Sequence, residues 1–193
     1  MRPYFEYIED IDFTKETREA LAKYVMDNLN LFNRSNTHVS KHGRYDWNWF
    51  LYGQDIPHEL MDEVGKRFKI PVSYEILGQT PFTNGRRHID RIVEGVPPRI
   101  SLMNFPIYPL DYDKIGPTQF WNLLSGSTDD YENAEFELAC EVDYSLKKPV
   151  IFNLQEYHNA LNDVDDHRFN AQFTTDIPFD EIVDLYDKGQ LFE

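Results

Sequence analysis

Apolar residues recur along this chain with two different periods, and the change of period divides the chain into a helical part and a β part. In the first part, Leu21 and Val25 follow the spacing of a helix over residues 14–31. Thr14 is a suitable N-cap because its hydroxyl can accept a hydrogen bond from a free backbone N–H group. A second helical stripe begins after Pro57. The pattern therefore predicts two helices before the first strand.

After Pro71 the period falls to two, which is typical of strands with one buried face. Val72, Tyr74 and Ile76 alternate with polar residues, and strand character recurs over residues 88–93, 99–108, 119–124, 134–144, 149–157 and 168–175. Residues 178–188 predict a last helix, which Gly189 ends. Since helices do not alternate with the strands, a doubly wound parallel sheet is disfavoured. Many short strands separated by turns favour a sandwich or jelly roll.

No repeat, low-complexity tract or linker interrupts the 193 residues, so we predict one domain. Its parts are a helical N-terminal part (1–70), a mainly β core (71–175) and a C-terminal helix (176–193). The aromatic-rich segment 38–52 contains His38, His42, Tyr45, Trp47 and Trp49. We expect it to plug the place where the helices cap the sheet, and a substrate-binding lid is the alternative.

Composition narrows the class of partner. The 34 acidic residues outnumber the 19 basic ones, giving a formal net charge of −15. This excess disfavours nucleic acid and anionic membrane surfaces as partners. The sequence shows no signal peptide and no apolar run as long as a membrane span. With the single Cys140 no intramolecular disulfide can form, and we expect a cytoplasmic protein.

Four residues suggest specific chemistry. His88 and Asp90 form a His-x-Asp pair, and His158 lies 68 residues beyond Asp90. Two histidines and one carboxylate can hold one face of a ferrous ion and leave other positions open. Arg168 follows His158 by ten residues and begins a strand, where its guanidinium can clamp the carboxylate of an organic acid. Taken singly, each histidine is more simply a surface or strand-end residue.

The strand that begins at Arg168 strengthens the combination. Its polar residues Arg168, Asn170, Gln172 and Thr174 share one face, and its apolar residues share the other. The apolar face requires a core. The polar face is either solvated or lines a polar cavity, and an arginine beside a metal-ligating histidine favours the cavity. Asn170 could then donate to the same carboxylate as Arg168.

In this order and spacing, His88, Asp90, His158 and Arg168 resemble the motif of the Fe(II)/2-oxoglutarate-dependent oxygenases. The segment Arg99-Ile100-Ser101-Leu102-Met103-Asn104-Phe105-Pro106-Ile107 is similar to small oxygenase-like proteins of tailed phages and marine viruses. Those proteins in turn resemble the aspartyl/asparaginyl β-hydroxylase group. The resemblance covers roughly residues 71–175.

The resemblance implies a distorted double-stranded β-helix, a cupin-like jelly roll, with the metal between its two sheets. His88, Asp90 and His158 would ligate Fe(II), and Arg168 would bind the distal carboxylate of the co-substrate 2-oxoglutarate. Arg99, at the start of a strand, is a second candidate for co-substrate binding, and a surface position is about equally expected for it. The implied reaction uses dioxygen to hydroxylate a peptide, protein or small molecule and releases succinate and CO2.

Two other functions stay open on the sequence. One is a non-catalytic jelly-roll protein that serves as a binding or structural protein of a virus. If the protein is viral, the expected location is the host cytoplasm. The other is a cupin-like metal enzyme that does not use 2-oxoglutarate. The loops that would choose a substrate match no pattern.

Overall fold

The computed structural model describes residues 4–34, 38–40, 43–45, 49–85, 87–90, 98–127 and 133–193, with no side chains given for residues 33–50. The predicted lid or plug of residues 38–52 therefore falls largely outside the described residues. The part of the predicted strand end that follows Asp90 falls outside them as well.

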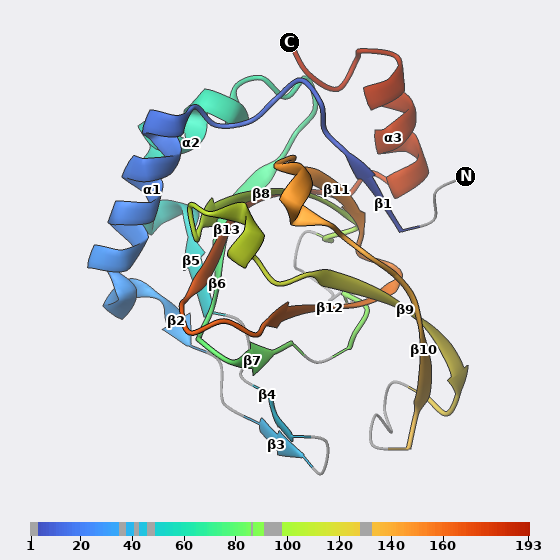
Figure 1. Ribbon diagram of the computed structural model, residues 1–193. Helices are drawn as coiled ribbons and strands as arrows, with labels where there is room; N and C mark the ends of the chain where they lie inside the picture. The colour runs from blue at the N-terminus through green and yellow to red at the C-terminus, as the bar shows by residue number, and fades with distance from the viewer. Residues whose placement is uncertain are drawn as a thin grey trace.

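Two antiparallel sheets face each other, and the helices lie on one side of them (Figure 1). The large sheet has the order β1-β11-β8-β13-β6-β5-β2, and the small sheet has the order β10-β9-β12-β7. The strands of the large sheet are β1 (Phe5–Tyr7), β2 (Asn33–Arg34), β5 (Trp49–Tyr52), β6 (Ser73–Gln79), β8 (Ser101–Tyr108), β11 (Val150–Asn153) and β13 (Arg168–Thr175). The small sheet contains β7 (Thr83–Asn84), β9 (Thr118–Ser125), β10 (Glu135–Glu141) and β12 (Tyr157–Asn162). The strands β3 (His38–Ser40) and β4 (Gly43–Tyr45) form a separate hairpin.

Many neighbouring strands in the two sheets are distant in sequence, as in a jelly roll. β8 lies between β11 and β13, and β9 lies between β10 and β12. The predicted fold class, a double-stranded β-helix with helices packed on it, is confirmed. Within the described residues, no helix is long and apolar enough to cross a membrane.

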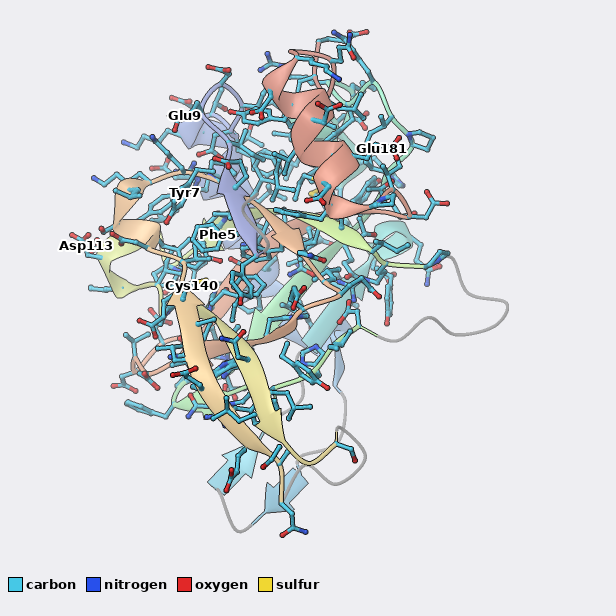
Figure 2. All side chains as sticks on the ribbon, turned by 90° about the vertical axis from the view of Figure 1, so that its right-hand side faces the viewer. Phe5, Tyr7, Glu9, Asp113, Cys140 and Glu181 are labelled. Carbon is cyan, nitrogen blue, oxygen red and sulfur yellow. The ribbon has the colours of Figure 1, made fainter. Side chains whose placement is uncertain are left out.

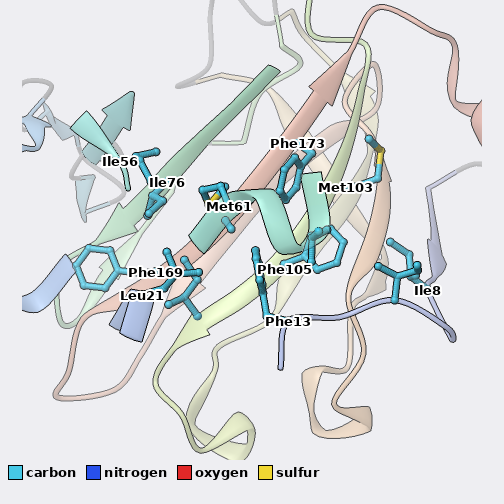
Figure 3. Packing of buried hydrophobic residues seen from close by; sticks show 14 of the residues in the cluster. Ile8, Phe13, Leu21, Ile56, Met61, Ile76, Met103, Phe105, Phe169 and Phe173 are labelled. Atoms are coloured by element: carbon cyan, nitrogen blue, oxygen red, sulfur yellow. The ribbon is translucent and has the colours of Figure 1, made fainter. Parts of the chain in front are cut away.

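The main core lies between the large sheet and the helices α1 (Lys15–Asp27), α2 (His58–Gly65) and α3 (Phe179–Asp187). Phe169 and Phe173 project from β13 toward Leu21 of α1 and Met61 of α2, as Figure 3 shows. Burying each such side chain contributes roughly 1.5–3 kcal/mol. Thr14 caps α1 as predicted, accepting from the backbone N–H of Thr17.

A second apolar cluster fills part of the space between the two sheets. Leu102 and Phe152 reach into it from the large sheet, and Phe120 reaches into it from the small sheet. Because successive side chains of a strand point to opposite faces, Met103 and Phe105 of β8 face the helices while Leu102 faces the second sheet. The interior between the sheets therefore receives Leu102 and Asn104 of β8 and the even-numbered residues of β13.

One strand prediction is wrong in a way that matters for the site. Residues 149–157 do not form one strand, because the chain turns after β11 and continues as β12. The Asn153 side chain accepts from the Gln155 backbone N–H, and the Asn153 carbonyl accepts from the Glu156 N–H. This turn moves the chain from the large sheet to the small one, so His158 lies near the start of a strand and not at its end.

The sequence also did not predict the strands of the first 70 residues that join the large sheet. β1 pairs with β11, and β5 pairs with β6. These strands have three or four residues each, which is too short for a period of two to be recognised. The β9–β10 ribbon extends from the body of the molecule in Figure 2, well away from α3.

The close contact between β6 and β13 can be tested at Gly78. A Cβ atom there would lie 2.5 Å from Cε1 of the buried Phe169 ring. We expect Gly78→Ala to lower the free energy of unfolding by roughly 1–3 kcal/mol, because the ring must leave its position. The matched control is Gly53→Ala, whose Cβ would make an ordinary contact at 3.4 Å with Tyr74. Equal denaturation midpoints for the two variants would contradict this packing.

Candidate metal centre and anion site

Backbone pairing brings the two candidate histidines together. The His88 N–H donates to the His158 carbonyl at 3.0 Å, and the His158 N–H donates to the His88 carbonyl at 2.9 Å. The two residues are thus directly opposite each other across an antiparallel bridge, and their ring centres are 4.5 Å apart. His158 also packs at 6.0 Å from the Phe120 ring of the second cluster.

Asp90 completes the group. Its N–H donates to the Leu154 carbonyl at 3.0 Å, which ties the residue to the turn between β11 and β12. Asp90 Oδ1 lies 3.3 Å from His88 Nε2 and 3.9 Å from His158 Nε2. One ligand atom from each of the three residues lies within 4.8 Å of the other two. The structure therefore brings the predicted His, Asp and His side chains to one point, where they could hold a metal ion.

The protonation states suit a metal ligand set. His158 Nδ1 lies 2.9 Å from the Glu156 carbonyl, an arrangement that holds the ring and directs Nε2 toward Asp90. Burial, helped by the neighbouring His88, lowers the pKa of His158 to about 4. Burial alone would raise the pKa of Asp90, but the His88 hydrogen bond and the Arg99 charge bring it down to about 2. At neutral pH the group therefore offers a neutral imidazole and a carboxylate.

Arg168 lies between the two sheets with its charge buried. The residue is 1% exposed. Its Nη1 donates to the Leu161 carbonyl at 3.0 Å, and its Nη2 donates to Thr118 Oγ1 at 3.2 Å. Its Cζ lies 5.0 Å from the centre of the Tyr144 ring. All of these partners are uncharged, and burial lowers the pKa of Arg168.

No carboxylate among the described residues forms an ion pair with Arg168, and its Nε has no hydrogen-bond partner among them. A buried charge is costly unless an opposite charge pairs with it. The predicted polar face of β13 is thus buried and points into the space between the sheets. Asn170 also lies on this face, 2% exposed, and its Oδ1 has no partner in the described part of the chain. The unpartnered Nε–H of Arg168 can donate to an anion, whereas the unpartnered Asn170 Oδ1 can only accept a hydrogen bond.

A chain of side-chain hydrogen bonds runs from Arg168 to the metal-site residues. Thr118 Oγ1 lies 3.0 Å from the Tyr144 hydroxyl, to which Asn104 Nδ2 donates at 3.2 Å. Gln172 Nε2 donates to Asn104 Oδ1 at 3.2 Å, and Arg99 Nη2 donates to Gln172 Oε1 at 3.2 Å. Arg99 Nη1 in turn lies 3.4 Å from Asp90 Oδ2. The candidate metal centre and the candidate anion site share one polar interior.

Sequence reasoning did not find Thr118, Tyr144, Asn104 or Glu75 as members of this interior. Thr118 and Tyr144 lie on elements that no motif marks, and only the closure of the sheets places them beside Arg168. His167 packs on the other face of β13, with its ring stacked on Phe169 at 5.7 Å.

No protein-family model and no curated protein matches the chain. Solved structures do match its fold. A prolyl-4-hydroxylase of Pseudomonas putida aligns at 13% identity over 89% of this chain and 92% of its own, with a TM-score of 0.50. The 2-oxoglutarate complex of a viral collagen prolyl hydroxylase from Paramecium bursaria Chlorella virus-1 aligns at 12% identity over 89% and 94%, also with a TM-score of 0.50.

A third structure is SnoK, a non-heme α-ketoglutarate-dependent carbocyclase from nogalamycin biosynthesis. It aligns at 12% identity over 90% of this chain and 81% of its own, with a TM-score of 0.54. The chain has the fold of these oxygenases. At such identities the likeness concerns the fold, and the chemistry has to be argued from the residues of the site.

The burial of His158 predicts a pH dependence of the metal-free protein. Its pKa is about 4 in the folded state and near 6.5 in the unfolded state, so the unfolded chain binds the extra proton between these values. The free energy of unfolding should therefore decrease by roughly 3 kcal/mol as the pH falls from 6.5 to 4. Above pH 6.5 the titration of His158 should not change the free energy of unfolding.

The measurement is urea denaturation of the wild type and of a His158→Asn variant across this range. The wild type should lose stability more steeply, because both proteins share every other titrating group. Parallel curves would contradict the burial and neutrality of His158.

Proposed function

We propose that the protein is an Fe(II)- and 2-oxoglutarate-dependent oxygenase that hydroxylates a peptide, a protein or a small molecule. The observation that carries the proposal is the buried guanidinium of Arg168, which faces uncharged partners in an interior shared with a His, Asp and His group. A metal site alone fits many enzymes. A metal site joined to a buried, unpaired arginine calls for a ligand that is both a chelator and an anion, and 2-oxoglutarate is both.

Each residue then has a distinct role. His88, Asp90 and His158 would hold the iron, since two neutral imidazoles and one carboxylate suit Fe(II) and leave positions open. Arg168 would bind the distal carboxylate, with its free Nε as one donor and the Thr118 and Tyr144 hydroxyls beside it. Asn170 lies on the same face and is proposed as a further contact. With iron and 2-oxoglutarate bound, the site would use dioxygen to oxidise a C–H bond, and it would release succinate and CO2.

The apolar surroundings limit access to this site. Phe120 packs on His158 and on Phe152, and this apolar cluster excludes water from that side of the interior. The His88 side chain is 38% exposed, whereas the His158 side chain is 11% exposed. A substrate would therefore approach from the His88 side. The fold neighbours include prolyl hydroxylases and an enzyme of small-molecule biosynthesis, so both substrate classes are included in the proposal.

Substitution of Arg168 distinguishes ligand binding at the candidate anion site from metal binding at the candidate metal centre. We expect Arg168→Met to weaken 2-oxoglutarate binding at least about 30-fold, since removal of one member of a buried charge pair costs roughly 2–5 kcal/mol. Binding of Mn(II) alone should change less than about threefold, because Arg168 ligates no metal. Isothermal titration calorimetry measures both constants.

The matched control is Arg67→Met, which removes an exposed guanidinium that donates to the Glu193 carbonyl. It should leave both constants unchanged. Equal loss of metal and 2-oxoglutarate binding in Arg168→Met would contradict the role assigned to Arg168.

The reaction itself is tested by succinate formation. Wild-type protein with Fe(II) and 2-oxoglutarate should form succinate in air and none under argon, and Asp90→Ala should form none in either. Metal-dependent activity that needs neither dioxygen nor 2-oxoglutarate would favour a cupin-like enzyme of another class. Ligand binding without any succinate would favour a non-catalytic binding protein.

A further inference from the structure

Arg99 contacts three polar side chains at the edge of the candidate metal centre. Its Nη2 lies 2.8 Å from Glu75 Oε1 and donates to Gln172 Oε1 at 3.2 Å. Its Nη1 lies 3.4 Å from Asp90 Oδ2. The Asp90 oxygen that faces the two histidines is the other one, Oδ1. Arg99 therefore holds the oxygen of Asp90 that points away from the histidine nitrogens.

The position of the guanidinium is set by the large sheet. Glu75 on β6 and Gln172 on β13 are directly opposite each other in the antiparallel register, so their side chains emerge side by side on one face. Gln172 Oε1 accepts a hydrogen bond from Nη2 of Arg99, and Glu75 Oε1 forms an ion pair with the same nitrogen. Gln172 is itself fixed by its bond to Asn104. A cross-strand pair on rigid strands thus aims the guanidinium at Asp90.

The charges of Arg99 and Glu75 affect how well Asp90 can bind a metal ion. A guanidinium beside a metal-ligating carboxylate competes with the metal for that carboxylate and repels the cation. Glu75 supplies the opposite charge, and its side chain is 12% exposed, so solvent screens the pair only in part. With Glu75 ionised, Arg99 can orient Asp90 through the ion pair with Oδ2 while its own charge is neutralised.

We propose that Arg99 is a positioning residue for the metal ligand Asp90, and that Glu75 neutralises Arg99 so that it does not compete with the metal. This inference rests on the proposed function only for the presence of a metal at His88, Asp90 and His158. It assigns Arg99 a role other than direct binding of the co-substrate. Glu75 and Gln172 become parts of the site without touching the metal. Outer partners of this kind commonly change metal affinity 10- to 100-fold.

The test is Co(II) binding to the full chain, which is measured by calorimetry and by the visible ligand-field spectrum. Glu75→Gln keeps the acceptor oxygen but removes the charge, so the uncompensated Arg99 should weaken Co(II) binding at least about tenfold. Adding Arg99→Gln to this variant removes the competing cation, and affinity should recover by several-fold. This recovery distinguishes neutralisation of Arg99 from a general structural effect of Glu75, which a second substitution would not reverse.

The matched control is Glu9→Gln, which removes a carboxylate beside β1 that pairs with Lys148 at 2.6 Å and contacts none of His88, Asp90 or His158 in the described ion pairs (Figure 2). It should bind Co(II) like the wild type. If Glu75→Gln is too unstable to titrate, Arg99→Lys replaces it. A lysine keeps the charge but cannot contact Glu75, Gln172 and Asp90 together, so about tenfold weaker binding and an altered spectrum are expected.

The outcomes separate this inference from the proposed function. Failure of the wild type to bind Co(II) would overturn the metal centre itself. Wild-type binding with unchanged affinity in Glu75→Gln or Arg99→Lys would overturn the positioning role alone. A double variant that binds no better than Glu75→Gln would overturn the neutralisation of Arg99.

Discussion

A positive charge buried between two sheets is the constraint on which the site depends. Arg168 cannot reach water, and the groups that accept its hydrogen bonds are neutral. Such a charge is tolerated only at a cost to stability, and an anion that enters the interior removes part of that cost. The interior around Arg168 is thus a candidate anion site, and its unpaired charge lowers the stability of the ligand-free protein.

The alternation of β13 makes this burial possible. Its odd-numbered residues, among them Phe169 and Phe173, complete the core under the helices, while Arg168 and its even-numbered neighbours face the small sheet. The same strand is therefore held by apolar packing on one face and carries the polar interior on the other. The turn after β11 has a comparable effect, because it moves the chain from the large sheet to the small one and places His158 opposite His88.

Much of the site could be predicted from the sequence. The His-x-Asp pair, the distant His158 and the spacing to Arg168 are local patterns, and the alternation along residues 168–175 already indicated a polar interior. The turn at Asn153 was missed because Leu154 continues an apolar run, although an asparagine that can accept from the backbone two residues later is a turn signal. Arg99 was one candidate for co-substrate binding, with a surface position about equally expected, and its contacts with Glu75 and Gln172 depend on the pairing of β6 with β13. No linear pattern encodes that register.

The central claim is that one interior holds a metal ion and an organic anion together. The most direct measurement is a crystal structure of the protein grown with Mn(II) and 2-oxoglutarate. The account predicts the metal on His88, Asp90 and His158, and the distal carboxylate of 2-oxoglutarate against Arg168 and Thr118. A metal held by other residues, or 2-oxoglutarate bound away from Arg168, would contradict it.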